Sequence, residues 1–322
     1  MKPVLAANLL GLFVAVWSHL GYSQTWPTRP IRFVIPFAPG GPSDIVARAM
    51  AVKLQPALGQ PVLIDNLLGA GGAIGIARVA KSTPDGYTIG YAANSTQAII
   101  PHMYRSLDYD PVKDFTYITK LAEYVNVLVV SSSSPYRTVS DIVKAAKAGT
   151  PGALTYASAG SGSTIHLSGE LLATMTGVKF THVPYKGSGP AILDVVAGRV
   201  SFMFDLLVNS RPQISADKLR AIATTGRSRM HQLPDLPTVA ETVPGFTVEN
   251  WVAVLGPAGM PKPITERLNL EFRKALQMQE VTDKFSVGYD ISPSTPDQLA
   301  ELVRRDLEYW GPIVRASGAT VD

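Results

Sequence analysis

The sequence contains no cysteine among its 322 residues. This absence excludes disulfides, thiolate nucleophiles and cysteine-ligated metals, so stability must come from a packed core, and a chain this long is expected to form two lobes. The sequence also has no dense block of Lys and Arg, and its formal net charge is only +4. So mild a positive excess does not indicate nucleic-acid binding.

Long apolar runs are also absent, except at the N-terminus, so we expect the mature protein to be soluble. There Lys2 precedes an apolar stretch at residues 4–17, and the small residues Gly21 and Ser23 stand where a cleavage site requires them. This pattern is typical of a secretory signal, so residues 1–23 are predicted to be a signal peptide. An uncleaved membrane anchor is the alternative.

The rest of the chain alternates short apolar runs with longer segments of helical periodicity. This alternation predicts an α/β fold with largely parallel sheets. Strands are expected at residues 31–37, 62–66, 87–92, 125–131, 154–158, 178–183, 200–205 and 220–224, and helices at 43–58, 70–82, 140–148, 164–176, 189–197, 263–277 and 296–316.

Two loop-like stretches, residues 121–126 and 244–251, are candidate hinges. They would divide the chain into a first lobe of residues 27–124 plus 251–322 and an inserted second lobe of residues 125–250.

The last expected helix carries its own start signal. Thr295 precedes Pro296, and Gln298 stands where a capping box needs it. Leu299, Val303, Trp310 and neighbouring residues form one apolar stripe, so we expect this helix to pack on a lobe.

A unit of strand, Gly-rich turn and helix recurs four times, at "PFAPGGPSD", "NLLGAGGAIG", "YASAGSGSTIH" and "PYKGSGPAILD". A helix start offers unpaired N–H groups and a partial positive charge, and glycine lets a ligand approach the backbone closely. Two lobes with such turns facing each other would form a cleft that could bind a carboxylate without Lys or Arg.

Nucleotide motifs do not fit these turns. No G-x-x-x-x-G-K-[ST] occurs, which excludes a P-loop. In "GAGGAIG", Ile74 occupies the position where a dinucleotide fingerprint has Gly or Ala. The strand that follows ends in Asn94 and Ser95 rather than in an acidic residue.

Catalytic and metal motifs are equally weak. Ser163, His166 and Asp205 could be imagined as a hydrolase set, but no G-x-S-x-G elbow is present. The five histidines show no metal-ligand spacing. We therefore predict no enzymatic activity, no cofactor and no metal, with a secreted serine hydrolase as the less favoured alternative.

Several longer segments together carry a family resemblance: "WPTRPIRFVIPFAPGGPSDIVAR", "NLLGAGGAIGIARVAKSTPDGYTIGYA", "LTYASAGSGSTIHLSGELL", "HVPYKGSGPAILDVVAGRVSFMFD" and "WVAVLGPAGMPKPI". Through them the chain resembles the Bug-type periplasmic solute-binding proteins of tripartite tricarboxylate transporters. The resemblance implies a two-lobed periplasmic-binding-protein fold (Venus flytrap, type II-like) with a ligand cleft between the lobes. It further implies a monomeric periplasmic receptor that captures a small carboxylate and delivers it to the membrane subunits of a transporter, or alternatively to a signalling partner.

The resemblance also implies the residues that contact the ligand. On the turn in "PFAPGGPSD" they are Phe37, Pro39, Gly40, Gly41 and Ser43, and on the turn in "YASAGSGSTIH" they are Ser158, Gly160, Gly162, Ser163, Thr164 and His166. At three further strand ends they are Asn94, Ser95, Tyr185 and Asp205.

Some of these positions have a second interpretation. Asn94 and Ser95 could cap a helix. Asp205 could either meet a ligand ammonium or accept hydrogen bonds from a neighbouring loop. Lys186 could face the ligand or the solvent, and Asp44 is expected to pair with Arg48 four residues later.

One segment departs from the family pattern. In "LAEYVNVLVV", Val125 stands where the family often has a proline, beside Glu123 and Tyr124. The far end of the pocket is therefore expected to differ, and the ligand class stays open between a flat aromatic acid, an aliphatic C4–C6 dicarboxylate and an amino acid.

Overall fold

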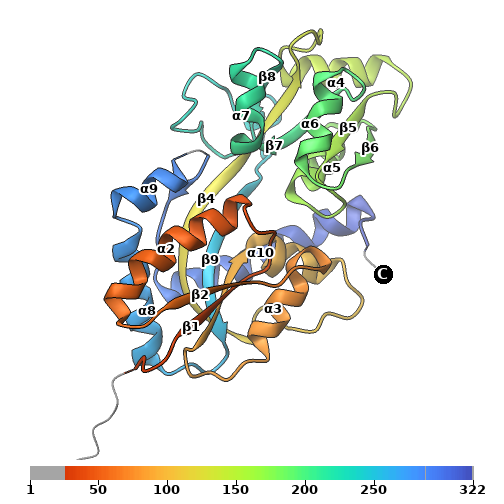
Figure 1. The fold of residues 1–322 in the computed structure, drawn as a ribbon. Helices are drawn as coiled ribbons and strands as arrows, with labels where there is room; N and C mark the ends of the chain where they lie inside the picture. The colour runs from red at the N-terminus through yellow and green to blue at the C-terminus, as the bar shows by residue number, and fades with distance from the viewer. Residues whose placement is uncertain (1–25, 287, 321–322) are drawn as a thin grey trace, which may run out of the picture.

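Two α/β lobes, joined by strands that run from one into the other, make up the computed structural model (Figure 1). The structure describes residues 26–286 and 288–320, so the predicted signal peptide lies outside the described residues.

Each expected helix and strand overlaps one that the described residues form, but the sequence pattern predicts no element at α7, α9, β9 or β10. The strands are β1 (Ile31–Ile35), β2 (Val62–Asn66), β3 (Thr88–Ala93), β4 (Phe115–Ser131), β5 (Thr155–Ser158), β6 (Thr181–Pro184), β7 (Phe202–Leu206), β8 (Leu219–Thr224), β9 (Glu249–Pro257) and β10 (Asp290–Ile291). The α-helices are α2 (Pro42–Leu58), α3 (Ala73–Ala80), α4 (Val139–Ala148), α5 (Thr164–Thr176), α6 (Ser188–Val196), α7 (Leu207–Ser215), α8 (Lys262–Ala275), α9 (Gln279–Phe285) and α10 (Pro296–Ser317). Short helical turns are η2 (Ala70–Gly72), η3 (Ser95–Ile99), η4 (Ile100–His102) and η5 (Val239–Glu241).

The first lobe is built on a sheet in the order β2-β1-β3-β9-β4. Strand β1 is parallel to β2 and β3, whereas β9 is antiparallel to β3 and β4. Because helices cover both faces, β1 reads as a nearly continuous apolar run in which only Arg32 is exposed. One face packs against α2, α8 and α9, and the other against α3 and the first part of α10.

The second lobe is built on the end of β4 together with β7, β8, β5 and β6. Strands β5, β6 and β7 run parallel to one another, and β4 is antiparallel to β7 and β8. Side chains of α4, α5 and α6 form one core with these strands, which includes Tyr156, Phe202 and Phe204.

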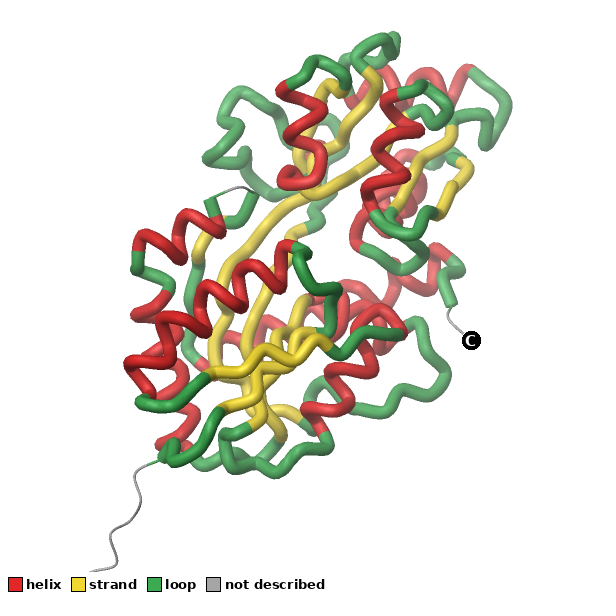
Figure 2. The backbone as a smooth tube through the Cα atoms, in the orientation of Figure 1, coloured by secondary structure: helices red, strands yellow, loops and turns green. Residues whose placement is uncertain are grey.

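Strand β4 belongs to both lobes. Its residues 115–125 pair with β9, and its residues 126–131 pair with β7 and β8. Figure 2 shows it as one continuous strand that passes from one lobe into the other. The pairing partner changes inside the predicted hinge at 121–126, although the lobe boundaries themselves stay a prediction.

The strands that cross between the lobes are longer than the sequence indicates. The apolar pattern predicts a strand that begins at Val125, but β4 begins at Phe115. The first half of the strand is not predicted because Lys120 and Glu123 interrupt its apolar pattern. Residues 244–251 are interpreted from the sequence as a hinge loop, so no strand is expected there, but β9 begins at Glu249. Strand β9 is a central strand of the first lobe and is buried except at Glu249.

Helix α10 packs against both lobes. Its start is capped as predicted by Thr295 and Gln298. Leu299 belongs to a core of the first lobe, whereas Trp310 belongs to the core of the second lobe. The helix therefore extends beyond the single lobe on which it is expected to pack.

Replacing Trp310 with alanine should destabilise the protein by about 3–5 kcal/mol, because the indole is 1% exposed and its removal leaves a cavity. Urea unfolding followed by circular dichroism measures the change. Leu193→Ala is the control, since Leu193 is 62% exposed and should change stability by less than about 0.5 kcal/mol. Equal effects of both substitutions would contradict the packing of α10 on the second lobe.

Candidate functional site

A cavity of about 670 Å³ lies between the two lobes. Segments of both lobes line it, including the turns that precede α2 and α5. Eight of the predicted ligand residues belong to its lining: Phe37, Gly41, Ser43, Ser95, Gly160, Gly162, Ser163 and Thr164. The structure therefore brings the two Gly-rich turns together around one space of the size that small-molecule sites have.

The first turn joins β1 to α2. Gly40 has a φ of +76°, which side chains rarely adopt, and its N–H donates to Asp44 Oδ2 at 2.9 Å. The N–H of Gly41 donates to the carbonyl of Ala38 at 3.2 Å. Both glycine N–H groups are therefore paired within the turn. The N–H groups left for a ligand are those of Ser43 and Asp44, because the first turn of a helix has no intrahelical acceptors.

Asp44 holds the first turn in shape. Besides the N–H of Gly40, its carboxylate accepts hydrogen bonds from Arg48 Nε at 2.8 Å and from Asn66 Nδ2 at 3.0 Å. The hydrogen bond from Arg48, together with those from Gly40 and Asn66, lowers the pKa of Asp44 to about 2 although the group is buried. The predicted pairing of Asp44 with Arg48 is thus confirmed.

The second turn joins β5 to α5 and repeats this arrangement. Gly162 has a φ of +79°, and its N–H donates to His166 Nδ1, again four residues later, at 3.1 Å. Ser163 caps α5: its hydroxyl accepts the N–H of His166 at 3.2 Å and donates to the carbonyl of Gly160 at 2.7 Å. The unpaired helix-start N–H groups here are those of residues 164–165.

Two stacked histidines, His166 and His182, form hydrogen bonds to the second turn. The rings of His166 and His182 lie 4.0 Å apart, and His182 Nε2 is 2.7 Å from the hydroxyl of Ser158. Burial lowers the pKa of His182 to about 4, and burial together with the neighbouring His182 lowers that of His166 to about 4. Both rings are therefore neutral at pH 7, which leaves His166 Nδ1 free to accept the N–H of Gly162.

These contacts do not form a hydrolase site. The hydroxyl of Ser163 bonds to backbone groups rather than to an imidazole. Ser158 does lie against His182, but its side chain is completely buried and cannot reach a substrate. Neither of these two described serines therefore combines a nucleophile with an accessible base.

Three other predicted residues have partners elsewhere. Asn94 is buried and donates to Asn250 Oδ1 at 3.1 Å, and the hydroxyl of Tyr185 donates to Asp194 Oδ2 at 2.6 Å. Asp205 is also completely buried. None of the three lines the cavity, so their roles as ligand contacts stay predictions.

Four more predicted positions also lie outside the cavity lining: Pro39, Gly40, Ser158 and His166. Their hydrogen bonds, where present, shape the turns rather than point into the cavity. Lys186 is exposed and is likewise absent from the lining.

The sequence analysis missed part of the lining. Ala70 and Gly71 lie on the turn "NLLGAGGAIG", whose strand–turn–helix pattern could have placed them. Tyr104 and Tyr289 also line the cavity, and no local motif marks them. Tyr124 lines it as well and lies in the segment that departs from the family pattern.

Among the described residues that line this cavity, none carries a charged side chain. An anion there would depend on N–H groups and hydroxyls, supplied by helix starts of both lobes. This donor set is the one expected for a carboxylate held without a salt bridge.

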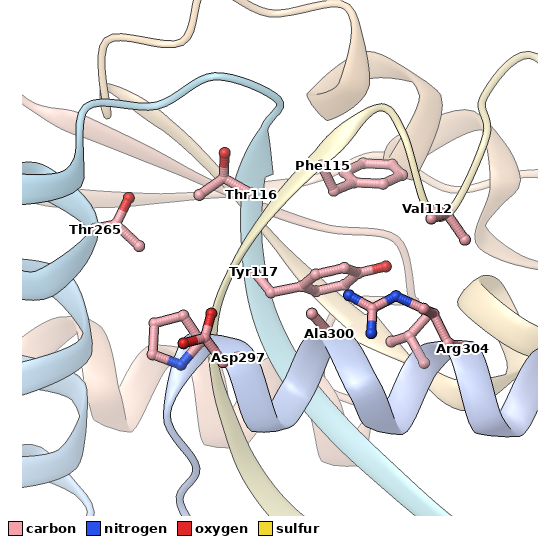
Figure 3. A pocket seen from close by; sticks show the side chains of 10 residues that line it. Val112, Phe115, Thr116, Tyr117, Thr265, Asp297, Ala300 and Arg304 are labelled. Carbon is pink, nitrogen blue, oxygen red and sulfur yellow. The ribbon is translucent and has the colours of Figure 1, made fainter.

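A second pocket of about 230 Å³ lies in the first lobe, where the start of β4 meets the start of α10 (Figure 3). In that view Ala300 and Arg304 on α10 face Tyr117 on β4. The two pockets have no described residue in common, and the predicted ligand residues all lie outside the smaller one.

Within residues 26–286 and 288–320, no cluster of three or more His, Asp or Glu side chains is arranged to hold a metal ion. Over the same ranges, no helix combines the length and the apolar character needed to cross a bilayer.

Comparison with known proteins gives a family match and close relatives. The family model described as "Tripartite tricarboxylate transporter family receptor" matches residues 46–319. The chain is 40% identical over 313 residues to the UPF0065 protein in the tcbD-tcbE intergenic region of Pseudomonas sp. (strain P51), covering 95% of this chain and 92% of the relative. It is 34% identical to protein BugT of Bordetella pertussis (strain Tohama I), covering 97% of each chain.

Solved structures share the fold. R. palustris Rpa4515 with adipate is 37% identical, with a TM-score of 0.81 over 91% of this chain and 98% of that one. MatC (Rpa3494) from Rhodopseudomonas palustris with bound malate is 34% identical, with a TM-score of 0.78 over 90% and 100%. The periplasmic binding protein BugD is 31% identical, with a TM-score of 0.78 over 92% and 99%. The predicted two-lobed α/β fold is thus confirmed.

The histidine pair predicts a pH dependence of stability. Because both pKa values are lower in the folded protein than the ordinary 6.5, the unfolded chain takes up protons first as the pH falls. The contribution to stability is therefore complete above about pH 6.5 and is lost towards about pH 4. Two independent histidines with these pKa values would lose roughly 5 kcal/mol from pH 7 to pH 4.5, and the partial exposure of His182 to solvent reduces this figure. We therefore expect a loss of roughly 2–5 kcal/mol, measured by urea unfolding.

The double variant His166→Gln/His182→Gln serves as the control for this experiment. It lacks both imidazoles, so its stability should depend less on pH over the same interval. An unchanged dependence in the variant would show that other groups are responsible.

Proposed function

The chain belongs to the tripartite tricarboxylate transporter receptor family, and from this premise we propose that it is a periplasmic receptor which binds a small carboxylate between its lobes and delivers it to the membrane subunits of such a transporter. The observation that carries this proposal is the cavity itself. Helix starts of both lobes meet there, and its described lining residues are all uncharged.

Ligand capture in this proposal is a binding step without chemistry. One carboxylate group accepts hydrogen bonds from the N–H groups at the starts of α2 and α5, one in each lobe. A ligand that contacts both turns favours the closed arrangement of the lobes only through contacts that it makes in the closed arrangement and not in the open one. The relatives whose structures contain adipate and malate support a carboxylate as the ligand class.

The strands that connect the lobes fit a hinge motion. Strand β4 changes its pairing partner between Val125 and Asn126, and β9 begins beside the same point at Glu249. Rotation about these few residues would open the cavity while leaving both cores intact.

The first test is a thermal-shift screen of the mature protein against mono- and dicarboxylates. A ligand at about 100 times its Kd should stabilise the folded state by roughly 2.7 kcal/mol, which raises the Tm by several degrees. The uncharged amide of each acid is the matched control and should have no effect. Equal shifts with acid and amide would contradict recognition of a carboxylate.

The second test is Gly41→Leu. Gly41 lines the cavity at the start of α2, its φ of −75° suits any residue, and a Cβ there would lie 3.1 Å from the carbonyl oxygen of Ala38. We expect the protein to fold and the affinity for its carboxylate to fall at least tenfold in calorimetric titration, because the side chain occupies the ligand's place.

Gly189→Leu is the matched control for this substitution. Gly189 is exposed at the start of α6 and lies outside the cavity lining, and a Cβ added to it would meet open space out to 4 Å. Full affinity in Gly41→Leu, equal to that of the control, would show that the ligand does not approach this turn.

A further inference from the structure

The lining of the cavity between the lobes includes two chemically different sets of residues. One set belongs to the turns before α2 and α5, which present N–H groups and hydroxyls. The other set is Tyr124, Leu206, Val252 and Tyr289, which we name the hinge wall. The difference between these sets bears on which carboxylate the site accepts.

The four residues of the hinge wall gather around one short stretch of β4. Val252 pairs with Ala122, and Leu206 pairs with Asn126, on either side of Tyr124. Tyr289 directly precedes β10, whose Asp290 pairs with Glu123 of β4. The register of these strands therefore places the four residues along the same stretch of β4, with Val252 and Leu206 on either side of the tyrosine pair, although they are distant in sequence.

The rings of the hinge wall are fixed before any ligand arrives. Tyr124 and Tyr289 meet edge to face with their centroids 5.2 Å apart, and Phe285 packs edge-on against Tyr289 at 5.7 Å. Tyr289 is only 7% exposed. Burial raises the pKa of its hydroxyl to about 12, so the hydroxyl is neutral at physiological pH. A rigid aromatic surface of this kind favours a flat ring, which can stack or pack edge-on.

An amino acid would lack a charged partner for its ammonium among the described lining residues. The nearest candidate, Asp205, is completely buried, and its two oxygens accept hydrogen bonds from Ser188 Oγ at 2.7 Å and from Ser210 Oγ at 2.6 Å. Asn209 Nδ2 adds a third contact at 3.3 Å. Asp205 is therefore engaged by side chains of α6 and α7 rather than by the neighbouring loop expected for its second role.

A second carboxylate would also be poorly accommodated at the hinge wall. The described residues of the lining include neither Lys nor Arg, and two of its polar side chains, those of Ser188 and Asn209, already donate to Asp205. The backbone of β4 beside Tyr124 pairs with β9, so it offers few N–H groups to a ligand. A charge buried there would be separated from water without compensation. The malate- and adipate-containing relatives do not determine the ligand of this chain.

Building on the proposed function, we infer that this receptor takes an aromatic monocarboxylate, with the carboxylate at the two turns and the ring against Tyr124 and Tyr289. These two tyrosines are then the residues that determine specificity. The turns and the hinge wall consist of different residues, so each set can be tested alone.

The test is calorimetric titration of the mature protein with three groups of probes. Benzoate, phenylacetate and 1-naphthoate represent aromatic monocarboxylates, and cyclohexanecarboxylate is the matched non-aromatic ring. Adipate, malate and L-glutamate represent the dicarboxylates and amino acids. We expect the tightest aromatic acid to bind at least tenfold more tightly than any probe of the other groups.

Variants of the hinge wall give an independent readout. Tyr124→Leu keeps an apolar side chain but removes the ring, and should weaken the tightest aromatic acid about tenfold while changing cyclohexanecarboxylate less than threefold. Tyr124→Phe keeps the ring and should retain the affinity for the aromatic acid. If Tyr124→Leu does not fold, Tyr124→Phe and the probe series still decide the matter.

The outcomes separate this inference from the function on which it rests. Tightest binding of adipate, malate, glutamate or cyclohexanecarboxylate would overturn the aromatic class but leave the carboxylate receptor intact. Equal weakening of all ligands by Tyr124→Leu would overturn the role of Tyr124 in specificity. Failure of every carboxylate to bind would refute the proposed function, and the inference with it.

Discussion

The arrangement of the site depends on a hydrogen bond that occurs once in each lobe. A glycine with positive φ donates its N–H to the side chain four residues later, from Gly40 to Asp44 and from Gly162 to His166. Because each turn is closed by its own side chain, the helix behind it starts at a fixed point. The N–H groups of that helix start are then held in place before a ligand arrives, which reduces the ordering cost of binding.

The two closing side chains differ in chemistry. Asp44 is a charged carboxylate, held ionised by Arg48, while His166 is a neutral imidazole packed on His182. The pKa of Asp44 is lowered to about 2, whereas burial lowers the pKa values of His166 and His182 to about 4. The groups that close the two turns therefore take up protons over different pH ranges, although the turns have the same backbone arrangement.

Much of this could be predicted from local sequence. The expected helices and strands follow from periodicity. The family resemblance identified eight lining residues, seven of which lie on Gly-rich turns that strand–turn–helix units place at the carboxyl ends of strands. The hinge wall could not be predicted in this way. Tyr124 and Tyr289 meet only through the pairing of β10 with β4, and no local pattern encodes a contact between residues so distant in sequence. Likewise, the first half of β4 is not predicted, because the polar residues Lys120 and Glu123 interrupt its apolar pattern.

Helix α10 has a consequence for how far the lobes can move. Trp310 is buried in the core of the second lobe, while Asp306, one turn earlier, accepts a hydrogen bond from the indole of Trp251 on β9 at 2.6 Å. Separation of the lobes must therefore carry the end of this helix along or bend it near Asp306. In the proposed hinge motion, the C-terminal helix would therefore act as a link between the lobes that restrains how far they separate.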